Sequence, residues 1–333
     1  MSASALSATH RALQVQRLSD DFSGVALCER PVPTVGAQQV LVRVRATALN
    51  FPDVLLTQGN YQFKPELPFV PGLEASGEVV AVGEGVRHVK PGDAVVATGR
   101  QGGLAEWILA AAGDVRVMPP GLTWAEGAAY SVAGLTAAVA LQERGHLRAG
   151  ETLVVHGASG GTGLAAVQLG RHMGARVIAT GRSMDKLQAA RSAGADALVV
   201  LGPQLREDLL ALTDGRGADV VFDPIGGDVF DASLRALAWG GRLLVIGFLS
   251  ERAATVRSNY LLIKGLSVLG VRAGEFARRD PERGEQLRRA VDDWAEQGVL
   301  RPHISTSFAL SEAVDALRLM ARGGVTGKVV VTP

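Results

Sequence analysis

The sequence predicts an α/β protein that combines a doubly wound parallel sheet with a second, β-rich domain. From residue 123 to residue 270, short apolar runs alternate with helical segments, which is typical of strand–helix–strand units in a parallel sheet. Residues 1–122 instead hold short apolar runs separated by turn residues, and the pattern changes again after residue 270. We therefore expect a discontinuous domain from residues 1–122 and 271–333, with residues 123–270 inserted as the doubly wound domain.

Composition narrows the possible partners. The 333 residues are 47% apolar and 20% charged, with a formal net charge of +1. This balance gives no electrostatic reason to expect nucleic acid or a membrane surface as partner. The single cysteine, Cys28, cannot form an internal disulfide, which fits a cytoplasmic protein. The N-terminus lacks a signal-peptide pattern, and the weakly polar residues 128–141 are too few to span a membrane and predict a buried helix.

The expected elements follow from apolar periodicity. In the β-rich domain we predict strands at residues 38–50, 75–86 and 92–98. In the doubly wound domain the predicted strands are 152–157, 175–181, 196–201, 218–224, 241–247 and 266–271. The helices between them are predicted at 162–174, 183–194, 204–215 and 227–240. Beyond these we expect a helix at 283–298, a strand at 303–308, a helix at 311–324 and a strand at 327–333.

A glycine-rich loop, "VVHGASGGTGLAAVQLG", carries the strongest chemical signal. It follows a predicted strand and opens a helix, so its backbone amides can approach a pyrophosphate at the helix N-terminus. The alternative is a tight strand–helix turn without a ligand, but the repeated strand–helix units favour a dinucleotide. The residues that we predict to bind it here are Gly157, Ser159, Gly160, Gly161, Thr162 and Gly163.

The next strand indicates which dinucleotide. It ends at Gly181 without the carboxylate that would bind the adenosine ribose of NAD. Arg182 and Lys186 are placed to pair with a 2′-phosphate, and Ser183 can donate to it. We therefore predict NADP(H). The alternative is that both cations are solvated at the start of the next helix, which the nearby Asp185 would suit.

Two later strands should also reach the cofactor, because ligands bind at the carboxyl edge of such a sheet. In "FDPIGG" and "VIGFLS" the corresponding residues are Ile225, Gly226, Gly247, Phe248 and Leu249. Asp223 could be an acid catalyst, but its position before Pro224 favours a turn-forming carboxylate.

At this point the sequence resembles the zinc-free quinone oxidoreductase-like family of the medium-chain dehydrogenase/reductase superfamily. The resemblance covers nearly the whole chain and rests on "ALNFPDVLLTQGNYQFKPELPFVPGLEASGEVVAVGEGV", "HGASGGTGLAAVQLGRHMGARVIATGRS", "GADVVFDPIGG", "GRLLVIGF" and "TGKVVV". It implies a GroES-like catalytic domain, a Rossmann domain, NADPH and a homodimer. One departure is Leu201, where many relatives have a tyrosine near the adenosine phosphate.

The resemblance also implies catalytic residues. Tyr61, in a "GNY" motif, matches a catalytic tyrosine of related enoyl-thioester reductases, so it is the candidate proton donor or enolate hydrogen bonder. Its alternative is a packing tyrosine beside Phe63 and Phe69. Asn50 matches the asparagine that faces the nicotinamide, and its alternative is a turn-capping amide before Pro52.

Two further cofactor contacts come from the same resemblance. Thr136 in "AGLTAA" matches a threonine near the nicotinamide ribose or amide, although a mid-helix threonine can simply bond to its own helix. Lys328 in "TGKVVV" resembles a C-terminal cofactor contact, with a surface lysine as the alternative.

The chain lacks the residues with which the zinc-dependent relatives bind their metal. Those relatives carry a cysteine near the position of Phe51–Asp53 and a histidine just before the glutamate of the Pro-Gly turn; here Leu73 precedes Glu74. No pair among the six histidines has ligand spacing. We therefore predict no metal, and a structural Glu74 that meets an arginine or backbone amides.

Without a Lewis acid to hold an alkoxide, hydride transfer to an activated acceptor is favoured over alcohol oxidation. The predicted function is NADPH-dependent reduction of a quinone or an α,β-unsaturated carbonyl. The first alternative is an enoyl-CoA or enoyl-thioester reductase, for which Arg272, Arg278 and Arg279 could hold a CoA phosphate or simply be a solvated helix start. A non-catalytic NADPH-binding regulator or RNA-binding protein is a further alternative, which the weak net charge disfavours.

Overall fold

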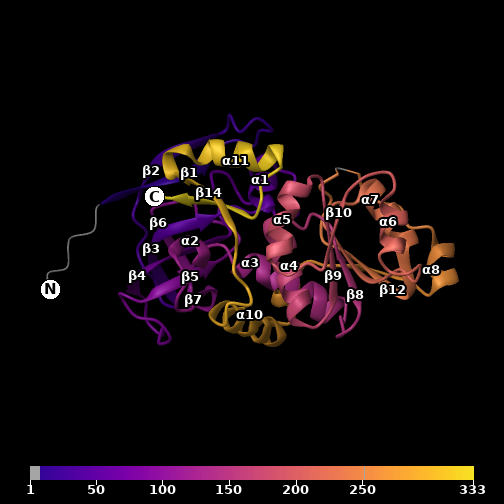
Figure 1. The fold of residues 1–333 in the computed structure, drawn as a ribbon. Helices are drawn as coiled ribbons and strands as arrows, with labels where there is room; N and C mark the ends of the chain where they lie inside the picture. The colour runs from indigo at the N-terminus through magenta and orange to yellow at the C-terminus, as the bar shows by residue number, and fades with distance from the viewer. Residues whose placement is uncertain (1–7, 251) are drawn as a thin grey trace. The chain divides into compact units, whose positions relative to one another are not determined.

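The computed structural model describes residues 8–250 and 252–333, and Figure 1 shows their course. The chain divides into two compact units, Met1–Val132 with Ile304–Pro333, and Ala133–His303. Residues 271–303, which the sequence groups with the β-rich domain, thus fall in the other unit. A contact in that unit explains this: Arg283 of helix α10 (Pro281–Glu296) donates to Glu143 of the π-helical segment η2 (Val139–Arg144) at 2.6 Å.

The first unit is built on a mainly antiparallel sheet with the order β14-β15-β3-β4-β5-β7, and β6 pairs with β3. A separate hairpin is formed by β1 and β2. The strands are β1 (Thr9–Val15), β2 (Val25–Pro31), β3 (Gln39–Ala48), β4 (Glu74–Val82), β5 (Ala94–Thr98), β6 (Trp107–Ala111), β7 (Val115–Val117), β14 (Ile304–Ala309) and β15 (Lys328–Thr332). The helices are α1 (Phe51–Gln58), η1 (Ala112–Asp114), α2 (Trp124–Gly127), η3 (Leu310–Glu312) and α11 (Ala313–Arg322).

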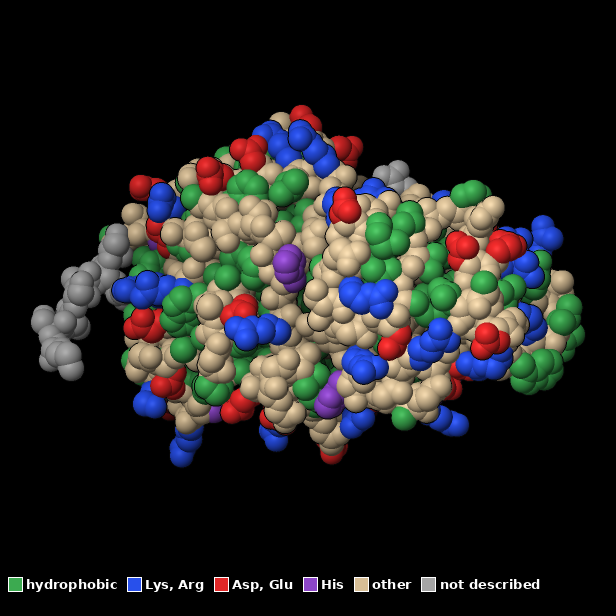
Figure 2. Space-filling model, in the orientation of Figure 1, with side chains coloured by type: hydrophobic (Ala, Val, Ile, Leu, Met, Phe, Trp, Pro, Cys, Tyr) green, Lys and Arg blue, Asp and Glu red, His purple; other side chains and the backbone are tan. Residues whose placement is uncertain are grey.

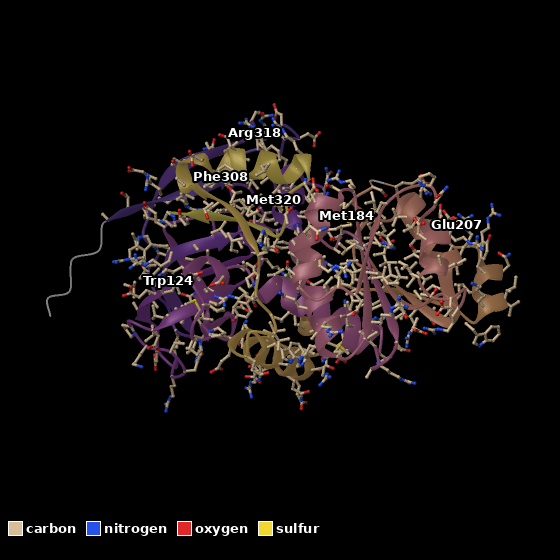
Figure 3. All side chains as sticks on the ribbon, in the orientation of Figure 1. Trp124, Met184, Glu207, Phe308, Arg318 and Met320 are labelled. Carbon is tan, nitrogen blue, oxygen red and sulfur yellow. The ribbon has the colours of Figure 1, made fainter. Side chains whose placement is uncertain are left out.

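The strand β3 shows why this unit forms a sheet with one buried face. Val42 and Val44 are buried, and Arg43 and Arg45 between and after them are exposed, which is the period of two that a half-buried strand requires. At the C-terminal end of the chain, α11 buries Leu317 in the core below it, and Phe308 and Met320 pack against the same cluster (Figure 3).

The second unit is the predicted doubly wound domain. Its parallel sheet has the order β10-β9-β8-β11-β12-β13 within the described residues, so two halves meet between β8 and β11. The strands are β8 (Thr152–Val155), β9 (Arg176–Gly181), β10 (Ala197–Val200), β11 (Ala218–Asp223), β12 (Leu237–Val245) and β13 (Ser267–Gly270). The helices are α3 (Ser131–Ala138, which contains the boundary between the units), α4 (Gly161–His172), α5 (Met184–Ser192), α6 (Leu205–Ala211), α7 (Gly227–Ala236), α8 (Ser258–Lys264), α9 (Ala273–Arg279) and α10.

Between β8 and β13, two elements differ from the prediction. The helix predicted at 227–240 ends at Ala236, and Leu237 already pairs with Ala218 as the first residue of β12. The register then shifts, and Gly240 takes a φ of +72°, so residues 238–241 form a bulge instead of a helical turn. The crossover helix α8 between β12 and β13 was not predicted at all.

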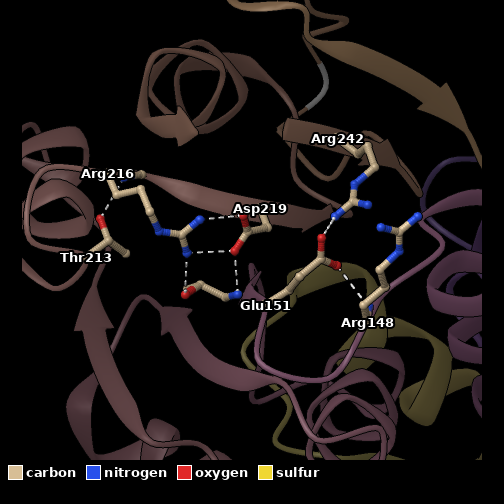
Figure 4. Close-up of polar contacts among 8 residues, drawn as sticks. Arg148, Glu151, Thr213, Arg216, Asp219 and Arg242 are labelled. Carbon is tan, nitrogen blue, oxygen red and sulfur yellow. Dashed lines mark hydrogen bonds and ion pairs between the residues drawn. The ribbon is translucent and has the colours of Figure 1, made fainter. Parts of the chain in front are cut away.

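An ion-pair network lies at the edge of the parallel sheet where its strands begin (Figure 4). Arg216 binds Asp219 through two nitrogens at 2.6 and 2.7 Å, and Asp219 also accepts from the backbone N–H of Thr152 at 2.7 Å. Beside it, Arg242 donates to Glu151 at 2.6 Å. Thr152 begins β8, Asp219 lies at the start of β11, and Arg242 pairs with Val220 next to Asp219, so the network stabilises the edge opposite to the one where dinucleotides bind.

The surface has mixed charge. Figure 2 shows Lys and Arg side chains interspersed with Asp and Glu over the visible face, which agrees with the near-zero net charge. In the part of the chain that the structure describes, no helix is both long enough and apolar enough to cross a bilayer.

Candidate active site

The glycine loop connects β8 to α4 at the carboxyl edge of the parallel sheet. Gly157 takes a φ of +60°, a left-handed conformation that favours glycine. A Cβ on Gly163 would lie against the carbonyl oxygen of Gly157 and only 2.8 Å from the Cα of Ala158. The first turn of α4 therefore packs directly on the loop, which leaves a backbone cradle at a helix N-terminus that fits a pyrophosphate.

The end of β9 lies beside this loop, because the backbone N–H of Ala158 donates to the carbonyl of Thr180 at 3.0 Å. Gly181 is buried as the last residue of β9, and Ser183 stands at the N-cap position of α5. Between them Arg182 is exposed, and no hydrogen bond or ion pair joins it to another described residue. Its guanidinium is therefore available to an anion at this edge.

The segments after β11 and β12 are brought side by side. The Asp223 carboxylate accepts from the backbone N–H groups of Ile225 at 2.8 Å and Gly226 at 3.0 Å, so it forms the turn, as predicted. The backbone N–H of Leu249 then donates to the carbonyl of Pro224 at 3.1 Å. The predicted cofactor residues 225–226 and 247–249 thus share one edge with the glycine loop.

Three further predicted residues lie on helices or in a loop. Thr136 is partly buried on α3 and not at the strand ends, and Lys186 is exposed in the first turn of α5. Tyr61 is half-buried in the loop after α1 and packs against the core cluster that contains Phe69, with Phe63 beside it. Tyr61 is thus a packing residue in the structure, and its role as a proton donor stays a prediction.

A buried polar cluster in the first unit joins residues that are far apart in sequence. The ammonium of Lys328 donates to Oε1 of Glu74 at 2.9 Å and to Oδ1 of Asn50 at 2.7 Å. The Asn50 amide in turn donates to the same Glu74 oxygen at 3.0 Å. The second Glu74 oxygen accepts from the backbone N–H of Val132 at 2.9 Å. All three side chains are buried, so the carboxylate is both neutralised and hydrogen-bonded.

This cluster decides between several alternatives from the sequence. Lys328 is only 5% exposed, so the surface-lysine interpretation is wrong. Asn50 stands at the N-cap position of α1, as its turn-capping alternative implies, and its side chain also donates to Glu74 and accepts from Lys328. Glu74 is structural and meets a backbone amide, as predicted, although its cationic partner is a lysine instead of an arginine.

Sequence reasoning missed Asp53. Its Oδ2 accepts from the backbone N–H of Asn50 at 2.8 Å and its Oδ1 from that of Gly72 at 2.9 Å, so it ties the start of α1 to the Pro-Gly turn. Burial raises the pKa of Asp53 to about 7, against the lowering effect of the two N–H donors and Lys328. The spacing Asn50-x-x-Asp53 is that of a capping box, which was the available signal.

The first unit does not fit a catalytic zinc ion. Among the described residues, no group of three or more His, Cys, Asp or Glu side chains could hold a metal. Glu74, the remaining carboxylate of the zinc pattern, already binds an ammonium, whose charge would repel a second cation at that place.

Two family models match the chain: residues 36–120 match the alcohol dehydrogenase GroES-like domain, and residues 161–291 match a model described as zinc-binding dehydrogenase. The quinone oxidoreductase-like protein 2 homolog of Nematostella vectensis is 37% identical over 304 residues, which cover 89% of this chain and 82% of that protein.

Solved structures of oxidoreductases have the same fold as this chain. A probable oxidoreductase from Mycobacterium abscessus superposes with a TM-score of 0.89 at 38% identity, covering 98% of this chain and 99% of that one. The mycobacterial protein Rv1454c complexed with NADPH has a TM-score of 0.88 at 29% identity, with 97% and 100% covered.

The two units and the models that they match define a medium-chain dehydrogenase/reductase. Within that superfamily the chain belongs to the quinone oxidoreductase-like family, and it is an oxidoreductase.

Proposed function

We propose that the protein is an NADPH-dependent reductase that transfers hydride to a quinone or an α,β-unsaturated carbonyl compound without a metal ion. The observation that carries the metal-free part is the buried bond from Lys328 to Glu74, beside Leu73 where zinc-dependent relatives have a histidine. A site without a Lewis acid suits acceptors that are already activated, because their own oxygen can take the negative charge that hydride brings.

The choice of NADPH over NADH rests on the end of β9. Arg182 is exposed there and has no hydrogen-bond or ion-pair partner among the described residues, and no carboxylate occupies the strand end. The NADPH complex of Rv1454c supports the same cofactor. The residues that we propose to contact it are Thr136, Gly157, Ser159, Gly160, Gly161, Thr162, Gly163, Gly181, Arg182, Ser183, Lys186, Ile225, Gly226, Gly247, Phe248, Leu249 and Lys328.

When bound, NADPH supplies the hydride, and the chain's residues orient the acceptor and complete the protonation. Asn50 is proposed to face the nicotinamide end, with its amide oriented by Glu74 and Lys328. Tyr61 is proposed to donate a hydrogen bond to the acceptor oxygen as charge develops there and then to give up its proton. The phenol is restored by a proton from water.

The enoyl-CoA alternative is less well supported. Of the arginines that could hold a CoA phosphate, Arg278 donates to Glu275 at 2.9 Å and Arg279 to the same carboxylate at 3.0 Å. Both guanidinium groups already share the Glu275 carboxylate within α9, which favours a solvated helix over a phosphate site.

We also propose a cytoplasmic homodimer. The strand β13 is at the edge of the parallel sheet, and apolar side chains are exposed near it: Leu262 is 83% exposed, Ile263 64% and Trp239 78%. A second copy could cover them, because an exposed apolar surface beside an open strand edge favours association. Light scattering after size exclusion tests this, and a monomer at micromolar concentration would contradict it.

A panel of acceptors tests the proposed reaction. Purified protein, with its zinc content measured, is incubated with NADPH and a quinone, an enone or an enoyl-CoA, and the loss of NADPH absorbance is followed. We expect turnover with the quinone or the enone and no stoichiometric zinc. Preference for the enoyl-CoA would support the alternative reductase. Tight NADPH binding without turnover of any acceptor would instead indicate a non-catalytic NADPH-binding protein.

A further inference from the structure

One imidazole joins the segments at the carboxyl edge of the parallel sheet. His156 lies between β8 and Gly157 and is completely buried. Its Nδ1 lies 2.7 Å from Oγ1 of Thr180, the residue before Gly181, and its Nε2 lies 2.6 Å from Oγ of Ser233 on α7.

The hydrogen-bond directions in this cluster follow from the number of protons. The Ser233 hydroxyl donates its single proton to the carbonyl of Val229 at 2.7 Å, so Nε2–H of His156 must donate to the Ser233 oxygen. Burial lowers the pKa of His156, although Asp223 opposes this shift, so the imidazole is neutral and Nδ1 accepts from the Thr180 hydroxyl. Every polar atom of the ring therefore has a partner of the right kind.

We propose that His156 is a positioning residue for NADPH: it holds the glycine loop and the end of β9 at a fixed spacing, so that pyrophosphate and 2′-phosphate can be bound together. The inference rests on the proposed cofactor. Thr180 takes part twice, because its carbonyl accepts from Ala158 of the loop and its hydroxyl donates to His156. The spacing matters most for the 2′-phosphate, which has to reach Arg182 two residues beyond Thr180.

Thr180→Val tests this without changing side-chain volume, and Thr180→Ser restores the hydroxyl. His156→Phe removes both ring hydrogen bonds at once. A matched control is Thr213→Val in the same unit, because the Thr213 hydroxyl is also buried and hydrogen-bonded, to the carbonyl of Leu209 at 2.8 Å, but lies away from this edge.

The measurement is the Kd for NADPH and for NADH, from cofactor fluorescence on each purified variant, together with its Tm. We expect Thr180→Val and His156→Phe to weaken NADPH binding by about five- to tenfold, and NADH binding less. Thr180→Ser should restore both values, and Thr213→Val should lower the Tm without changing either Kd.

Unchanged Kd values in Thr180→Val, with a lowered Tm, would overturn the positioning role and leave the proposed cofactor intact. Equal losses for NADPH and NADH would contradict the link to the 2′-phosphate. If the wild-type protein bound no NADPH, the cofactor assignment and this inference would both be wrong. If His156→Phe fails to fold, Thr180→Val alone decides.

Discussion

The ammonium of Lys328 and the carboxylate of Glu74, 254 residues apart in sequence, form a 2.9 Å ion pair that is buried on both sides. Such a pair need not stabilise a fold relative to apolar side chains, but its two members depend on each other. Removal of one leaves a buried charge without a partner. Substitution of one member should therefore lower the free energy of unfolding more than substitution of both.

Lys328→Met should lower the free energy of unfolding by about 3–5 kcal/mol, because Glu74 is left buried and unpaired. The double variant Glu74→Gln with Lys328→Met should recover part of this loss. Urea denaturation measures both. The control is Arg318→Met, which breaks the exposed pair with Asp315 on α11 (Figure 3) and should cost less than about 1 kcal/mol. Equal losses for Lys328→Met and Arg318→Met would contradict the buried ion pair.

Asp53 should make stability depend on pH in a direction opposite to that of most carboxylates. Its pKa is raised to about 7 in the folded protein from 3.8, so between these values the folded state binds more protons than the unfolded one. Its contribution is thus fully present below about pH 4 and is lost as the pH rises through about 7. Asp53→Asn should remove this loss.

The free energy of unfolding of Asp53→Asn minus that of wild type should therefore rise with pH, on the order of 1 kcal/mol per unit between pH 4 and 7. Denaturation at several pH values gives this difference. Asp93→Asn is the control, because hydrogen bonds from Lys90 lower the pKa of Asp93, so its difference from wild type should not change between pH 4 and 7. A difference for Asp53→Asn that does not change with pH would show that its carboxyl is ionised throughout.

Gly163→Ala should weaken NADPH binding by tenfold or more, which corresponds to a loss of roughly 1.4 kcal/mol. The added Cβ would clash with backbone atoms of Gly157 and Ala158, so the loop would have to move. Gly113→Ala is the control outside the loop, because a Cβ on Gly113 would meet no atom within 4 Å. Fluorescence titration compares the two. Similar losses in both variants would contradict the close packing of α4 on the loop.

The parallel sheet could be predicted because its strands are buried on both faces and appear as continuous apolar runs, such as Thr152–Val155. The helix α8 could not. It is seven residues long, and its apolar residues 260–263 form one continuous run, so no helical period marks it in the sequence.

Only part of the candidate site could be predicted from the sequence. Glycine spacing is local, so residues 157–163 could be assigned to the loop from sequence alone. The cluster of Lys328, Glu74 and Asn50 depends on β15 pairing with β3, which no local pattern reports. His156 and its partners Thr180 and Ser233 come from three different elements, so their contact also becomes visible only in the folded chain.

Arg182→Ala should raise the KM for NADPH by roughly 10- to 100-fold, the effect of losing a charged hydrogen bond to phosphate, and leave that for NADH nearly unchanged. Steady-state kinetics with both cofactors measure this. Arg171→Ala is the control, because it removes an exposed cation that pairs with Asp196 in the same unit, and it should change neither KM. Equal changes with NADPH and NADH would refute a 2′-phosphate contact.

Tyr61→Phe separates proton donation from packing, because phenylalanine keeps the ring against the core cluster and removes only the hydroxyl. If the phenol donates, kcat should fall by roughly 10²-fold while the Tm stays near that of wild type. Tyr260→Phe on α8 is the control and should leave kcat unchanged. A kcat for Tyr61→Phe equal to that of wild type, with both a quinone and an enone, would leave Tyr61 as a packing residue and assign protonation to water.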